Sequence, residues 1–69
     1  MSDNAYKLIQ VVGTSKVGVG EAVQNAISRA AKTMKNIGWF ETSQIRGSVS
    51  DGRITEFQVE VRIGFRLED

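Results

Sequence analysis

Apolar residues recur at steps of three and four across residues 19–37, which is the spacing of one face of an α-helix. Polar and charged residues fill the opposite face, so the pattern predicts an amphipathic helix. Lys32 and Lys35 fall near its C-terminal end, where positive charge suits the helix dipole. Gly38 is placed to adopt the left-handed conformation just past that end. The apolar face consists of Val19, Ala22, Val23, Ala26, Ile27, Ala30, Met34 and Ile37.

Two other segments have the pattern of β-strands. The segment of residues 6–12 is short and rich in β-branched and apolar side chains, which predicts a strand. Residues 13–16 (GTSK) are expected to end this strand. Residues 57–67 alternate strictly between apolar and polar, which is typical of a strand with one buried face. The apolar stripe of this last strand, from Phe57 to Leu67, is predicted to form the core.

The last strand is predicted to form a β-hairpin with residues 39–49. The Asp-Gly pair at 51–52 suits the two central positions of a type I′ turn, which both need a positive φ. A β-bulge in the hairpin would shift the pairing by one residue. The pairs expected from a simple two-residue hairpin are Glu41 with Arg62 and Ile45 with Gln58.

These elements predict an α+β fold in the order β-α-β-β, with a three-stranded antiparallel sheet packed on one amphipathic helix. Residues 1–69 are expected to form a single domain, since a chain of this length fits only one and has no linker. One helix covers only one side of such a sheet. The other side carries polar residues of the last strand, and Trp39 is expected near it, so this side suits a ligand or a subunit contact.

Composition favours self-association and argues against catalysis. A chain of 69 residues buries only about 60% of the surface that it exposes when unfolded, and scaffolds of this size often need extra stabilisation. The sequence contains no cysteine for a disulfide and no histidine or cysteine for a zinc or copper site. No acidic pair is arranged for acid–base work. We therefore expect no catalytic residue, no metal site and no enzymatic activity.

The charge balance narrows the range of partners. Nine basic and eight acidic residues give a net charge of +1, which argues against a nucleic-acid binder that depends on phosphate neutralisation. No apolar run approaches the ~20 residues that span a bilayer, and residues 1–7 lack the apolar core of a signal peptide. We expect a cytoplasmic protein with no membrane or nucleic-acid partner.

The chain resembles the dodecin family in a series of short segments. None of them is diagnostic alone, but their order and spacing match over residues 6–68. The second strand departs from the family pattern at Thr42 and Ser43, which make it more polar. These two residues and Ser48 could alter the floor of the pocket, which leaves the choice of flavin open. The matching segments are GTS at 13–15, NAISRA at 25–30, KT at 32–33, WFE at 39–41, RG at 46–47, DG at 51–52, FQV at 57–59 and GFRLE at 64–68.

The resemblance implies a hollow homododecamer with flavins bound at two-fold subunit contacts. It implies that Trp39 stacks on the isoalloxazine ring and that Gln58 hydrogen-bonds the polar edge of the ring. It also places Arg46 and Arg66 near ligand phosphates or the subunit contact. These residue types suit the roles, because indoles stack on flat rings, an amide both donates and accepts, and a guanidinium can hold a phosphate bidentately.

The function implied is storage or scavenging of a flavin, either FMN or riboflavin, whose photoreactivity is quenched between tryptophans. Two alternatives remain open. One is an oligomeric shell that binds coenzyme A or another nucleotide at Arg46 and Arg66. The other is a platform for single-stranded nucleic acid on the open side of the sheet, against which the lone tryptophan and near-neutral charge argue.

Overall fold

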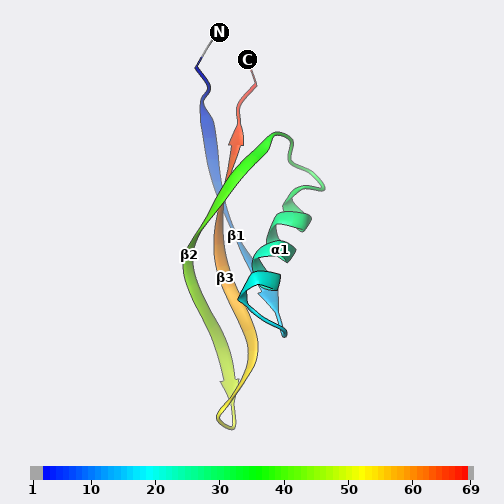
Figure 1. Cartoon of the computed structure of the whole chain (residues 1–69), viewed down its shortest axis with the longest axis vertical. Coiled ribbons are helices and arrows are strands. Elements are labelled where there is room, and N and C mark those ends of the chain that lie inside the picture. The colour runs from blue at the N-terminus through cyan, green and yellow to red at the C-terminus, as the bar shows by residue number, and fades with distance from the viewer. Residues whose placement is uncertain (1–2, 69) are drawn as a thin grey trace.

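The computed structural model describes residues 3–68 and contains one helix and three strands in the order β-α-β-β (Figure 1). The strands pair antiparallel in the order β1-β3-β2, so β3 is central. The predicted fold class and element order are confirmed. The elements are β1 (Tyr6–Ser15), α1 (Val19–Ala30), β2 (Ile37–Ser50) and β3 (Arg53–Arg66).

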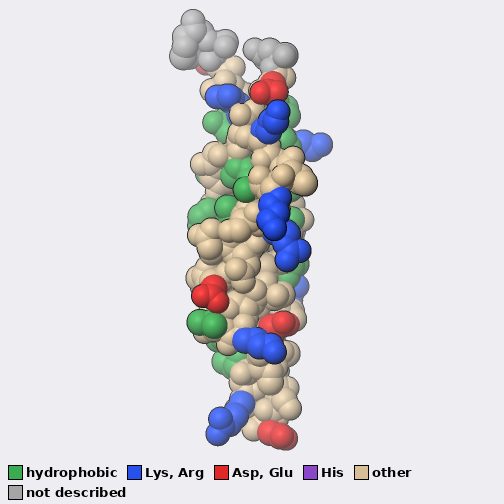
Figure 2. Space-filling model, turned by 90° about the vertical axis from the view of Figure 1, so that its right-hand side faces the viewer, with side chains coloured by type: hydrophobic (Ala, Val, Ile, Leu, Met, Phe, Trp, Pro, Cys, Tyr) green, Lys and Arg blue, Asp and Glu red, His purple; other side chains and the backbone are tan. Residues whose placement is uncertain are grey.

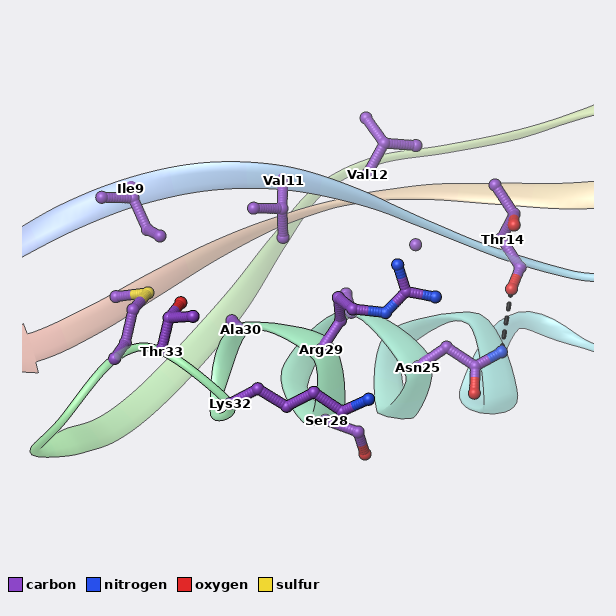
Figure 3. Close-up of a pocket in the computed structure, with 13 residues that line it drawn as sticks. Ile9, Val11, Val12, Thr14, Asn25, Ser28, Arg29, Ala30, Lys32 and Thr33 are labelled. Carbon is purple, nitrogen blue, oxygen red and sulfur yellow. Dashed lines mark hydrogen bonds between the residues drawn. The ribbon is translucent and has the colours of Figure 1, made fainter.

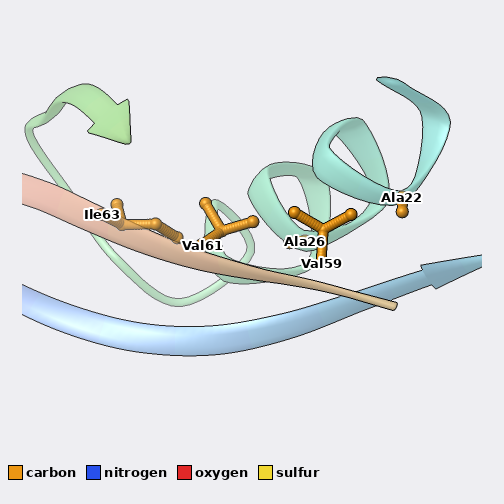
Figure 4. Packing of buried hydrophobic residues seen from close by; sticks show 5 residues of the cluster. All are labelled: Ala22, Ala26, Val59, Val61 and Ile63. Carbon is orange, nitrogen blue, oxygen red and sulfur yellow. The ribbon is translucent and has the colours of Figure 1, made fainter. Parts of the chain in front are cut away.

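The core lies between α1 and the central strand. Val59, Val61 and Ile63 of β3 are fully buried against Ala22 and Ala26 of α1 (Figure 4). The small alanine side chains let the helix approach the sheet closely, and the alternation of β3 supplies the facing apolar row. The centre of the predicted apolar stripe is confirmed as core.

The C-terminal end of that stripe is not core. Leu67 lies beyond β3 and is exposed. Alternation alone predicted it as buried, but the helix does not reach that end of the strand (Figure 1).

The helix ends earlier than its apolar pattern predicted. α1 ends at Ala30, and the amides of residues 32 and 33 donate to carbonyls three residues back, at 3.3 and 3.2 Å. The lysines predicted for the last turn therefore lie beyond the helix. Met34 and Ile37 still pack against the core from outside the helix. Because the apolar spacing continues past the helix, periodicity did not reveal where it ends.

Asn36, not Gly38, turns the chain from the helix connection into β2. Asn36 has a φ of 66°, in the left-handed region that asparagine tolerates better than most residues. Gly38 lies inside β2, where the Tyr6 ring covers it: a Cβ at Gly38 would lie 3.3 Å from Tyr6 Cε2. The prediction for Gly38 was therefore wrong. The missing side chain at Gly38 instead lets the Tyr6 ring pack against the β2 backbone.

β1 continues through the segment that was predicted to end it. Gly13 pairs with Val59, and the ladder extends to Ser15. A Cβ at Gly13 would lie 2.9 Å from both the carbonyl carbon of Ala22 and the Cβ of Ala26. Gly13 is thus a strand residue that allows the helix backbone to lie directly against β1.

The β1–α1 corner is held by a side chain from the strand. Ser15 Oγ accepts hydrogen bonds from the amides of Val17 (2.9 Å) and Gly18 (3.4 Å), and it lies 3.3 Å from Glu21 Oε1, to which it donates. Gly18 at the N-cap supplies no side-chain cap.

α1 is short, and none of the described helical structure is long and apolar enough to cross a membrane.

The hairpin turn is as predicted, but the strands beyond it contain bulges. Asp51 and Gly52 have φ values of 52° and 76°, as a type I′ turn requires. Thr55 of β3 has no partner in the ladder, which shifts the register by one residue, and the unpaired Ser43 of β2 shifts it back.

These two bulges decide which side chains face each other across the hairpin. Glu41 lies opposite Arg62, as predicted, and accepts an ion-pair hydrogen bond from it at 2.9 Å. The predicted pairing of Ile45 with Gln58 is wrong. Between the bulges, Gln58 lies opposite Arg46.

The molecule leaves much apolar surface uncovered. It measures 56 × 20 × 13 Å, and apolar side chains are exposed along its length (Figure 2). Its accessible surface of 5111 Å² exceeds the about 4,300 Å² expected for a compact monomer of this mass. α1 packs on β1 and β3, so the same side of the β2–β3 hairpin stays open. The exposed apolar residues there are Phe40, Ile45, Val49 and Ile54.

Gly13→Ala is expected to destabilise the protein by about 1–3 kcal/mol or more, because the new methyl group meets helix backbone that cannot move aside cheaply. Gly20→Ala is the matched control, since a Cβ there meets nothing within 4 Å and alanine favours the helix by about 1 kcal/mol. Urea unfolding at one fixed protein concentration measures both. Equal stability of the two variants would contradict the proposed role of Gly13.

Candidate functional site

Side chains of all three strands form the face of the sheet that points away from α1, which we call the open face. Alternation along each strand and the observed pairing put them on one side. The face mixes polar, charged and aromatic groups. Its members are Tyr6, Leu8, Gln10, Val12 and Thr14 of β1, Trp39, Glu41, Gln44, Arg46 and Ser48 of β2, and Gln58, Glu60, Arg62, Gly64 and Arg66 of β3.

Trp39 lies flat on the backbone of the central strand. It pairs with Gly64, and a Cβ at Gly64 would come within 2.6 Å of Trp39 Cζ2 and 2.8 Å of Nε1. The indole therefore occupies the space that a side chain at position 64 would fill. Trp39 remains 41% exposed, so the ring is supported from below and open to solvent above.

Tyr6 supports the indole from the side. The two ring centroids lie 6.3 Å apart with an interplanar angle of 53°, which is a favourable tilted arrangement. Neither Tyr6 nor Gly64 was predicted as a site residue. A glycine that interrupts the polar face of an alternating strand was the signal for Gly64, because such a glycine often marks a close approach by another group.

Arg46 and Gln58 lie side by side, as partners across the hairpin. Arg46 Nε donates to Gln58 Oε1 at 3.3 Å, and Arg46 Nη1 donates to Glu60 Oε2 at 2.8 Å. Gln58 Nε2 in turn donates to Glu56 Oε1 at 3.1 Å. The amide and the guanidinium are thus both held within a polar network.

Arg66 lies at the other end of the open face. It pairs with Tyr6 and is two residues from Gly64 on the same strand, so it lies near Trp39. Its backbone amide donates to Asn36 O at 3.0 Å. Within residues 3–68 its guanidinium makes no ion pair within 4.0 Å, in contrast to Arg46.

The four predicted site residues therefore form two clusters. Trp39 and Arg66 lie in one, and Arg46 and Gln58 lie in the other. Gly64 and Gln58 are six positions apart on β3, which corresponds to about 20 Å along the strand. A ring stacked on Trp39 does not reach Gln58 of the same chain.

A groove of about 620 Å³ lies on the other side of the molecule, between β1 and α1 (Figure 3). Ile9, Val11 and Met34 make its apolar floor, and Arg29 and Lys32 bring positive charge to it. Figure 3 shows the Arg29 side chain between the helix and β1. None of the four predicted site residues lines this groove.

Comparison with known proteins identifies the family. The family model described as Dodecin matches residues 5–68. The curated dodecin of Thermus thermophilus is 44% identical over 64 residues, which is 93% of each chain. The chain belongs to the dodecin family.

Solved dodecin structures share the whole fold. The dodecin from Streptomyces coelicolor superposes with a TM-score of 0.93 at 46% identity, covering 100% of this chain and 99% of the other. A tryptophan-to-phenylalanine variant of the T. thermophilus dodecin gives a TM-score of 0.91 at 40% identity, with 97% and 100% coverage.

Thr42, Ser43 and Ser48, the polar residues expected to affect the choice of flavin, lie on both sides of β2. Thr42 pairs with Val61 and so lies on the helix side, away from the open face. Ser43 Oγ donates to Glu60 Oε1 at 3.4 Å, and the Ser48 hydroxyl lies 2.6 Å from that of Thr55. Of these three residues, the two serines lie on the open face.

The open face offers no metal site among residues 3–68. No group of three or more His, Cys, Asp or Glu residues gathers there or elsewhere in the described chain. Its acidic side chains instead pair with arginines or amides.

Gly64→Ala is expected to displace the Trp39 ring, since the added methyl group would occupy the space of the indole, at a cost of about 1–3 kcal/mol. Trp39 is the one tryptophan of the chain, so intrinsic fluorescence reports on it alone. We expect a red-shifted emission and stronger acrylamide quenching, with Gly20→Ala as the unaffected control. An unchanged emission spectrum in Gly64→Ala would show that the indole does not rest on Gly64.

Proposed function

We propose that this dodecin-family chain binds a flavin, FMN or riboflavin, as a storage or scavenging protein, and that it has no enzymatic role. The observation that carries the proposal is the Trp39 ring, supported on the Gly64 backbone and open above. A flat ring fixed in this way is prepared for stacking, because little side-chain freedom remains to be lost on binding. The isoalloxazine ring of a flavin is a flat partner of suitable chemistry.

A second copy of the chain completes the proposed site. Gln58 suits the polar edge of a flavin, since its amide donates and accepts, but it lies about 20 Å along β3 from the Trp39 cluster. If Trp39 comes from one subunit and Gln58 from another, the two side chains can contact the same ligand. The exposed apolar residues of the hairpin support self-association, and we propose the homododecamer that the family resemblance implies.

A bound flavin supplies a chromophore that becomes reactive when it absorbs light. The chain would contribute the surroundings: Trp39 would cover one face of the ring and offer it an electron-rich indole. Gln58 would orient the polar edge of the ring. Neither side chain needs to move a proton, which agrees with storage and quenching.

The charge pattern of the open face does not favour the nucleic-acid alternative. Arg46 and Arg62 are each paired with a carboxylate of the same face, Glu60 and Glu41. A platform for single strands combines stacking aromatics with a continuous basic groove. We therefore do not propose nucleic-acid binding.

Trp39→Ala is expected to weaken flavin binding by roughly tenfold to a hundredfold, because stacking on an aromatic side chain is worth about 1–3 kcal/mol. Titration of purified protein into FMN and riboflavin measures this through quenching of flavin fluorescence. The unaltered protein should quench strongly and saturate near about one flavin per chain. Unchanged flavin fluorescence with the unaltered protein would overturn the proposed function.

A mixing experiment tests whether two chains share the site. Trp39→Ala chains and Gln58→Leu chains each lack one component, but unfolding them together and reassembling them would give some sites with Trp39 and Gln58 both intact. Random mixing restores about a quarter of the sites if the two side chains come from different subunits. Binding no better than that of the separate variants would contradict a shared site.

The groove beside α1 favours a second ligand, a phosphorylated nucleotide such as coenzyme A. It combines an apolar floor with Arg29 and Lys32, although positive charge near a helix C-terminus also complements the helix dipole. This placement differs from the Arg46 and Arg66 site considered for coenzyme A from the sequence.

Joint replacement of Arg29 and Lys32 by alanine is expected to weaken coenzyme A binding on the order of tenfold, through loss of charge-assisted hydrogen bonds. Lys35→Ala is the matched control, since Lys35 does not line the groove. Calorimetric titration measures each protein. An equal loss in the control, or full affinity in the double variant, would argue against the groove as the nucleotide site.

A further inference from the structure

Arg46 is engaged inside its own chain. Its Nη1 donates to Glu60 Oε2 at 2.8 Å and to Gln44 Oε1 at 3.2 Å, while Nε donates to Gln58 Oε1 at 3.3 Å. An arginine holds a phosphate best with two parallel N–H groups. Two of the nitrogens of Arg46 are already occupied, and its charge is offset by a carboxylate.

Glu60 is itself fixed in place. Its Oε1 accepts hydrogen bonds from Gln10 Nε2 of β1 and from Ser43 Oγ of β2, while Oε2 accepts from Arg46. Its side chain is 20% exposed, against 43% for Arg46. Glu60 therefore links all three strands, and it draws Arg46 toward the middle of the sheet.

The surroundings of Gln58 are acidic on balance. Glu60 pairs with Arg46, and Glu56 accepts a hydrogen bond from Gln58 itself at 3.1 Å. One carboxylate thus pairs with Arg46, and a second hydrogen-bonds the neighbouring Gln58 amide. The Arg46–Glu60 separation of 2.8 Å is well inside the screening distance of about 8 Å at physiological salt.

We propose that Glu60 determines the phosphate specificity of the site, by neutralising Arg46 and so lowering the affinity for FMN relative to riboflavin. This inference rests on the proposed flavin function. A phosphate monoester carries a charge of about −1.5 to −2 at neutral pH. Near Arg46, such a phosphate must either displace Glu60 and leave a carboxylate that is 20% exposed without its cation, or approach Arg46 while Glu60 remains paired with it. Riboflavin has no phosphate, so neither free-energy cost applies to its binding. A site that lowers the affinity for one ligand in this way favours the other.

Glu60→Gln is the direct test, because glutamine keeps the shape and an oxygen acceptor while removing the charge. Dissociation constants for FMN and riboflavin, measured by flavin fluorescence, give the ratio of the two affinities for each protein. We expect the variant to favour FMN by about three- to tenfold more than the unaltered protein, as the release of one charge next to a phosphate suggests. The gain should shrink at high salt.

Asp51→Asn is the matched control. It removes the same charge from the same hairpin, far along the strand from Arg46, and asparagine tolerates the positive φ of 52° at that turn position. Its FMN-to-riboflavin ratio should equal that of the unaltered protein. If Asp51→Asn changed this ratio as much as Glu60→Gln does, the inference would be overturned, because loss of any negative charge would then have the same effect.

A double variant tests whether Glu60 acts through Arg46. Adding Arg46→Gln to Glu60→Gln should abolish the gain in FMN preference, a coupling that a merely structural role of Glu60 would not produce. Circular dichroism and size-exclusion chromatography confirm that each variant is folded and assembled, and Glu60→Thr gives a second neutral replacement if glutamine impairs assembly.

The outcomes separate the inference from the proposed function. Riboflavin binding with an unchanged ratio in both neutral Glu60 variants would overturn the role of Glu60 and leave flavin storage standing. Absence of both riboflavin and FMN binding by the unaltered protein would overturn the two together. A raised ratio that disappears in the double variant would support the inference.

Discussion

The backbone contact between α1 and β1 at Gly13 positions the rest of the structure. Without a side chain at Gly13, the carbonyl of Ala22 lies directly on the strand, and the apolar row of β3 is buried beneath the helix. Tight packing of this kind fixes where the helix can lie. A helix of 12 residues placed over β1 and β3 leaves β2 uncovered on the same side.

This placement of the single helix leaves two surfaces of the sheet uncovered. One is the apolar side of the hairpin, and the other is the open face, with its supported tryptophan and its polar network. A small domain without disulfides gains stability by covering such surfaces with further copies of itself. The two halves of the proposed flavin site lie about 20 Å apart on one strand, so assembly and ligand binding would depend on the same contacts.

The open face also shows how strand pairing gives different roles to similar residues. Arg46 and Arg66 both lie on it, but Arg46 is neutralised by Glu60, while Arg66 makes no ion pair within residues 3–68. The bulges at Thr55 and Ser43 contribute to this difference, because between them Arg46 lies opposite Gln58 and next to Glu60, which also accepts a hydrogen bond from Ser43. In the proposed site, selectivity for a phosphate would therefore depend on register as well as composition.

The sequence by itself determined the element order, the buried centre of β3 and the type I′ turn, because alternation, helical spacing and turn chemistry are local properties. It also pointed to Trp39, Gln58, Arg46 and Arg66 through their resemblance to dodecins. Only the tertiary structure decided the helix end, the strand role of Gly13, the partner of Gln58 and the support of Trp39 by Gly64. Each of these depends on which distant backbone comes close, and a bulge or a missing Cβ changes that without altering the local pattern.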